Sequence, residues 1–180
     1  MQQMIIDVTG KTFPQYMQEA VLYPLHMTNS TYQPPPHPPV AFAAATGYYA
    51  DGKVVKGGWH IYPEMAAAGL WTTASDLATF LIGLQQALAG TAEPVISRAM
   101  ARQMITEQRD NDGLGLFLAG KGKTLRFSHN GRDDGFDAGM VGYVETGQGA
   151  VLLINANDAS GGLFQLFEAI ARTYNWPDYP

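Results

Sequence analysis

The last third of the chain changes from helical to strand periodicity, and this change limits its fold more than any other feature. From Gly113 onward, short apolar segments at 115–118, 124–129, 139–144 and 150–155 alternate with glycine-rich turns. Connections this short join antiparallel neighbours, because a parallel pair needs a crossover of about a dozen residues or more. The pattern therefore predicts an antiparallel meander.

A helix is predicted to follow the last of these strands. Residues 163–174 place Leu163, Leu166, Phe167 and Ile170 on one side, which is typical of a helix that covers one face of a sheet. The expected fold class is α/β of the α+β type, with an antiparallel sheet of three to five strands flanked by helices. A length of 180 residues is long for one domain and short for two, so we expect residues 1–180 to form a single unit.

The first hundred residues are mainly helical in pattern. Segment 75–88 has Ser75 as its expected N-cap and ends near Gly90, and segment 97–105 begins at Ser97 with Met100, Met104 and Ile105 on its buried side. Shorter helices are expected at 1–8 and 13–22, an extended proline-rich connector at 33–39 and a small hairpin around Asp51-Gly52.

Composition excludes several classes of protein. The net charge is -5, and no basic cluster could neutralise a row of phosphates, so nucleic acid is not expected as a partner. The chain has no cysteine, and its four histidines show no metal-ligand spacing, so neither a metal nor a cofactor is expected. None of the five serines begins an S-x-x-K motif or lies in G-x-S-x-G, so no serine is visibly activated.

Two segments resemble a known family. AAAGLWTTASDLATF at 66–80 and FSHNGRDDGF at 127–136 are similar to the penicillin-recognising serine hydrolases of the class C β-lactamase type, which include D-Ala-D-Ala peptidases and esterases. Weaker matches are VTGK at 8–11, PLHMT at 24–28 and the stretch 155–163, so the resemblance spans nearly the whole chain. It implies part of a β-lactamase/transpeptidase-like fold.

The resemblance also implies which residues form the site. The family places S-x-x-K, Y-x-N and a strand with K-x-G or H-x-G around its pocket, and only the last is present, as His129-Asn130-Gly131. By this resemblance, His129 orients or polarises the substrate, Asn130 and Gly131 bind it, and the backbone N–H of Arg132 is an oxyanion donor. We expect His129 to Gly131 to lie on a strand beside a pocket, antiparallel to the strand at 139–144.

Other residues in the two matching segments are expected to have structural roles. Trp71 to Thr73 are expected to cap the following helix, and Asp133, Asp134 and Asp137 to form a solvated acidic turn.

Two functions are compatible with these features. In the first, the chain is the C-terminal portion of a serine hydrolase acting on a lactam, peptide amide or ester through an acyl-serine intermediate, and is inactive alone. In the second, it is a non-catalytic domain that binds a ligand or partner. Codons for S-x-x-K and Y-x-N upstream in the gene would favour the first, and a genuine start at Met1 the second.

The resemblance carries two further expectations. Members of the family are commonly periplasmic, secreted or membrane-tethered. In the resembling fold the last strand, here 150–155, pairs with a strand of the enzyme's N-terminal part, so we expect an exposed apolar edge and self-association through it.

Overall fold

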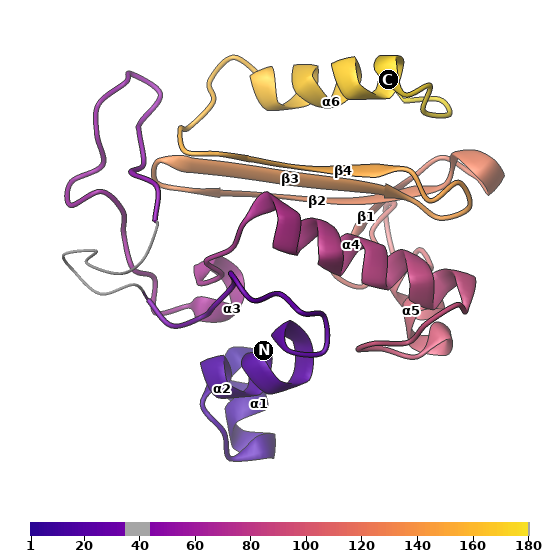
Figure 1. Cartoon of the computed structure of the whole chain (residues 1–180), viewed down its shortest axis with the longest axis horizontal. Coiled ribbons are helices and arrows are strands. Elements are labelled where there is room, and N and C mark those ends of the chain that lie inside the picture. The colour runs from indigo at the N-terminus through magenta and orange to yellow at the C-terminus, as the bar shows by residue number, and fades with distance from the viewer. Residues whose placement is uncertain (35–43, 180) are drawn as a thin grey trace.

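The computed structural model describes residues 1–34 and 44–179 and contains a four-stranded antiparallel sheet (Figure 1). The strands are β1 (Phe117–Ala119), β2 (Arg126–Asp133), β3 (Phe136–Tyr143) and β4 (Gly149–Ile154). Their order in the sheet, β1-β2-β3-β4, is their order in the chain, which confirms the predicted meander.

The second and third strands are longer than predicted and meet in a tight hairpin. Asp133 pairs with Phe136, so only Asp134 and Gly135 form the turn. Gly135 has a φ of 84°, and a Cβ there would lie 2.5 Å from Cγ2 of Val55. Glycine is needed at this position both for its backbone conformation and because another segment packs against the turn.

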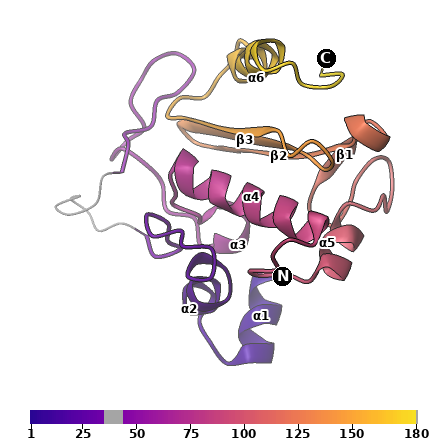
Figure 2. The same ribbon diagram turned by 45° about the vertical axis from the view of Figure 1, so that its right-hand side comes forward.

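Helices cover both faces of the sheet (Figures 1 and 2). On one face lies α6 (Gly162–Thr173), whose Phe167 packs with Val141 and the fully buried Tyr143 of β3. On the other face lie α4 (Ala74–Ala89) and α5 (Arg98–Met104), around the fully buried Phe127. Burying each large apolar side chain contributes about 1.5–3 kcal/mol, so the two clusters hold the helices on the sheet.

The N-cap of α4 is Thr73, not Ser75. Thr73 has extended backbone angles and its hydroxyl accepts a hydrogen bond from the N–H of Asp76, whereas Ser75 already lies within the first turn. The cap therefore belongs to the Trp71 to Thr73 segment, as the resemblance implied. The predicted end of the helix is confirmed, since Gly90 adopts the left-handed conformation with a φ of 75°.

Two predicted helix faces need correction. Ser97 caps α5 as expected, but Met100 is exposed, because the buried side is centred on Ala101 and continues to Met104. Leu166 of α6 is also exposed, since Leu163 and Phe167, one turn apart, define the centre of its buried side.

The N-terminal elements lie below the α4 face of the sheet (Figure 1). They are α1 (Gln2–Thr9), α2 (Phe13–Met17), the π-helical turn η1 (Gln18–Leu22) and the short α3 (Met65–Ala68). A 3-10 turn, η2 (Gly122–Thr124), precedes β2. No helix in the described ranges is both long and apolar enough to cross a membrane.

The region between η1 and α3 has little regular structure. The hairpin expected around Asp51-Gly52 consists of a single bridge between Tyr48 and Val54. The first positions of its predicted first strand at 41–49, and most of the proline-rich connector at 33–39, fall in residues 35–43, outside the described residues.

Candidate active site

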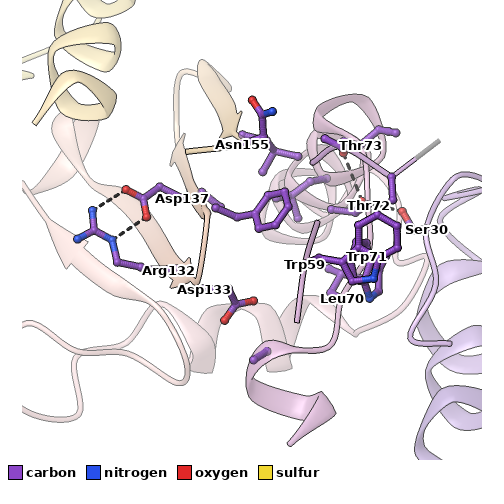
Figure 3. A pocket seen from close by; sticks show the side chains of 18 of the residues that line it. Ser30, Trp59, Leu70, Trp71, Thr72, Thr73, Arg132, Asp133, Asp137 and Asn155 are labelled. Carbon is purple, nitrogen blue, oxygen red and sulfur yellow. Dashed lines mark hydrogen bonds and ion pairs between the residues drawn. The ribbon is translucent and has the colours of Figure 1, made fainter. Parts of the chain in front are cut away.

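A cavity of about 1180 Å³ lies between the α4 face of the sheet and the N-terminal segments. Its walls come from the hairpin of β2 and β3, the end of β4, the loop after η1 and the segments on either side of α3 (Figure 3). His129, Asn130, Gly131 and Arg132 all line it. The structure therefore brings the four residues predicted for the site together beside one cavity.

The strand that carries these residues is open along half of one edge. β1 pairs only with residues 126–128 of β2, while β3 pairs with β2 along its whole length. His129 lies opposite Met140 and Asn130 opposite Gly139. The predicted antiparallel pairing of 129–131 with the strand at 139–144, beside a cavity, is confirmed.

The register decides which backbone groups face the open edge. Val144 N–H donates to the carbonyl oxygen of Leu125 at 3.0 Å, and the pairing between β2 and β3 continues from there without a bulge. Alternation in an antiparallel ladder then directs the odd-numbered residues of β2 toward β3 and the even-numbered ones away. The N–H groups of Asn130 and Arg132 consequently point outward at the unpaired edge.

The histidine of the motif has a defined place. Its ring stacks on Phe117 of β1, with centroids 5.7 Å apart and planes 12° apart, and the residue stays exposed. A Cβ at Gly131 would have no atom within 4 Å, so the space before this part of the backbone is open to a ligand.

Asp137 is not part of a solvated turn. It lies in β3, is only 5% exposed and forms a two-pronged ion pair with Arg132 on the neighbouring strand, at 2.6 and 2.5 Å. Arg132 also donates to the carbonyl oxygen of Asp158 at 2.7 Å. The side chain of Arg132 thus serves the fold, while its N–H faces the open edge.

Hydrogen bonds affect the pKa of Asp137 more strongly than burial does. Burial alone would raise its pKa, but Arg132, the N–H of Asp158 and the amide of Asn157 all stabilise the charged form, so the pKa lies below its ordinary value. Asn157 also donates to the carbonyl oxygen of Asp133 and accepts from the N–H of Gly135. The hairpin tip is thereby tied to the loop that leads from β4 to α6.

The sequence did not predict this network because the expected strand extended no further than Gly131, whereas β2 continues to Asp133. A two-residue turn at Asp134-Gly135 places Arg132 directly opposite Asp137, so the Asp-Gly pair was the signal that could have revealed the contact.

A second polar cluster fixes the opposite wall. The buried carboxylate of Asp76 accepts hydrogen bonds from the N–H of Asn29 at 2.7 Å and the hydroxyl of Ser30 at 2.8 Å. The hydroxyls of Ser30 and Thr72 are 2.7 Å apart. Among the described residues, Ser30 is the only serine that lines the cavity, and its hydroxyl is hydrogen-bonded to a carboxylate and a neighbouring hydroxyl rather than to a histidine or lysine.

The rim of the cavity near the hairpin is acidic and aromatic. His60 lies 3.1 Å from the carboxylate of Asp134, and the hydroxyl of Tyr62 accepts from the N–H of Asp134 at 3.1 Å. In the same cavity, the rings of Trp59 and Trp71 meet edge to face with centroids 5.6 Å apart. In the described parts of the chain, no three histidines and carboxylates are grouped closely enough to hold a metal ion.

Comparison with known proteins gives a family and a fold. Residues 1–174 match the family model described as beta-lactamase, whereas no curated protein sequence matches the chain. The structure is similar to an octameric penicillin-binding protein homologue from Pyrococcus abyssi, with a TM-score of 0.73 and 21% identity over 97% of this chain and 40% of that one.

Two further solved structures are similar. A D-amino acid amidase from Ochrobactrum anthropi SV3, complexed with D-phenylalanine, has a TM-score of 0.68 and 22% identity over 96% of this chain and 56% of that one. A mutant class C beta-lactamase has a TM-score of 0.71 and 16% identity over 93% and 54%. These likenesses confirm the predicted fold class, and the chain spans only 40% to 56% of these proteins.

Proposed function

The chain belongs to the beta-lactamase family, and from this premise we propose that it is the C-terminal portion of a serine hydrolase, lacking the S-x-x-K and Y-x-N segments. The reaction of the intact enzyme is acyl transfer from a lactam, peptide amide or ester to a serine, followed by hydrolysis. This portion supplies the strand that holds the substrate and stabilises the charge that develops on its carbonyl oxygen.

The open edge of β2 beside the cavity is the observation that carries this proposal. Acyl transfer needs N–H donors aimed at the developing oxyanion, and each such donor contributes about 3 kcal/mol. The outward N–H of Arg132 is such a donor, and the empty space before Gly131 lets a substrate approach it. In this proposal Asn130 lines the bound substrate, and His129 orients or polarises it.

The nucleophile must come from outside these residues. No serine of the chain begins S-x-x-K, and the hydroxyl of Ser30 donates a hydrogen bond to the carboxylate of Asp76. We therefore expect that neither a fluorescent penicillin nor a fluorophosphonate ester labels this chain by itself.

Labelling tests the proposal. The upstream sequence of the gene should encode S-x-x-K and then Y-x-N, and the longer product should be labelled on the S-x-x-K serine while the 180-residue chain is not. Mass spectrometry of the adduct identifies the labelled residue. Covalent labelling of any of the five serines of this chain, stable to denaturation, would contradict the proposal.

One observation favours a second function, binding without catalysis. The cavity is well formed although the chain has no activated serine, so a domain made of these residues alone could hold a ligand. Reversible binding without acylation, together with a genuine start at Met1, would support this alternative.

We also propose self-association through the outer edge of β4. This strand ends the sheet, and the outward backbone groups of Val151 and Leu153 have no partner among residues 1–34 and 44–179. Directly after the strand, the carbonyl oxygen of Asn155 accepts a hydrogen bond on that side from the N–H of Tyr48. An apolar open edge favours strand addition by a second copy, and the homologue from Pyrococcus abyssi is described as octameric.

A further inference from the structure

The side chain of Phe117 is exposed although its backbone is held on both sides. Phe117 pairs with Ser128 of β2 and forms a bridge to Asp112 on its other side. Its neighbours Leu116 and Leu118 pack into the apolar cluster that α4 and α5 form with the sheet. Phe117 itself is 47% exposed, so its ring is an apolar surface on a fixed backbone and contributes little to the core.

The imidazole of His129 stacks on this ring. The two centroids are 5.7 Å apart and the planes 12° apart, at the place where β1 ends and the open edge of β2 begins. Stacked aromatic rings attract each other beyond the area that they bury, and the contact limits rotation of the imidazole about its side-chain bonds. Phe117 therefore fixes the direction of the His129 ring beside the open edge.

No polar group orients this imidazole. None of the hydrogen bonds or ion pairs among residues 1–34 and 44–179 involves the ring of His129. His60 differs, because its Nδ1 lies 3.1 Å from the carboxylate of Asp134. A histidine held by such a partner has one nitrogen occupied, whereas stacking leaves both nitrogens of His129 available. A neutral imidazole can then donate to a ligand through one nitrogen and accept from it through the other.

We propose that Phe117 is a positioning residue of the site and acts through His129. Its ring holds the imidazole beside the outward N–H groups of β2, with both nitrogens available to the substrate. The inference rests on the proposed function, in which His129 orients or polarises the substrate. It adds to the site a residue that lies on a different strand and outside the H-x-G motif.

A double-mutant cycle in the longer enzyme tests the inference. Phe117→Leu keeps an apolar side chain but removes the ring, and we expect kcat for a chromogenic ester to fall about tenfold at an unchanged KM. Phe117→Tyr keeps the ring and should retain the wild-type kcat. In a His129→Ala background, Phe117→Leu should have no further effect, because the residue through which it acts is gone. The matched control Tyr174→Leu removes another exposed ring and should leave kcat unchanged.

NMR of the 180-residue chain tests the contact itself. The face of the Phe117 ring shields the imidazole C–H protons of His129, so Phe117→Leu should move their resonances downfield. Phe117→Tyr should leave them near their wild-type positions. Unchanged resonances in Phe117→Leu would overturn the inference.

The outcomes separate this inference from the proposed function. A wild-type kcat in Phe117→Leu, or an equal loss with and without His129, overturns the positioning role while the longer enzyme still acylates. Absence of acylation on the S-x-x-K serine of the wild-type longer enzyme overturns the proposed function, and the NMR comparison then still decides whether Phe117 fixes the ring. If Phe117→Leu fails to fold, Phe117→Met, which also lacks the ring, takes its place.

Discussion

The sheet has two open edges that differ in what surrounds them. Beyond β1, residues 129–133 of β2 expose their edge beside a cavity, and the hairpin that carries them is braced by the Arg132–Asp137 pair. The outer edge of β4 also offers unpaired backbone groups, at Val151 and Leu153, but the residues of this strand are apolar. The surrounding side chains therefore favour different partners for the two edges: a small ligand at the edge of β2 and another strand at the edge of β4.

The largest effect is expected at the β2 edge. Arg132→Pro removes the outward N–H, and we expect acyl transfer by the longer enzyme to fall about a hundredfold to a thousandfold. Acylation rates with a chromogenic ester or lactam measure the change.

Arg132→Ala is the matched control, because it removes the ion pair but keeps the N–H. It should be less stable than the wild type yet acylate within about tenfold of its rate. Equal loss of acylation in both variants would assign the effect to the side chain and remove the N–H from the mechanism.

The next largest effect is expected at the Arg132–Asp137 ion pair, which stabilises the hairpin that carries this edge. Asp137→Asn removes the charge from a buried group that accepts from Arg132 and the N–H of Asp158, and we expect a loss of about 2 kcal/mol in the free energy of unfolding. Urea unfolding measures it, with the exposed Asp110→Asn as control. An unchanged midpoint would show that Arg132 and Asp137 contribute no more than a surface pair.

The Arg132–Asp137 ion pair also predicts that the folded chain loses stability at acid pH. The pKa of Asp137 is lowered in the folded chain, and that of Asp158, which accepts from Ser160 and from the N–H of Leu163, is lowered to about 2 from 3.8. A lowered pKa gives stability that is present above the unfolded value and lost as pH falls through the folded one. Thermal unfolding between about pH 5 and pH 2 should show this loss, and Asp137→Asn should make it shallower.

The smallest effect concerns the β4 edge. Val151→Pro removes an outward N–H without breaking a bond to β3, and we expect self-association to weaken about tenfold, measured by light scattering. Ala150→Pro, whose N–H faces β3, should instead unfold the chain. A wild-type chain that is strictly monomeric at micromolar concentration would refute the proposal for this edge.

Much of the fold could be predicted because its signals are local. Strand alternation and short glycine turns determine the meander, and Gly90 ends α4 by its own backbone preference. The cap at Thr73 was misplaced by two residues because Ser75 is an equally good capping side chain, and only the backbone angles distinguish them.

The site was less predictable because its contacts are distant in sequence. The H-x-G motif located His129 to Gly131, but the environment of Asp133 depends on Tyr62 and Glu64 folding back over the hairpin. Asn29 and Ser30, which donate hydrogen bonds to Asp76, lie more than forty positions from it in the sequence. No period or spacing within the strand carries that information.

The side chain and the main-chain N–H of Arg132 have separate roles, and this separation affects how mutations can change the site. Its side chain braces the hairpin, while the group facing the open edge belongs to the main chain. A main-chain N–H survives every codon change at its position except one to proline. Under the proposed function, mutation of Asn130 changes which substrates fit the cavity while the N–H at position 132 is retained, so the substrate preference of related enzymes can diverge faster than their reaction.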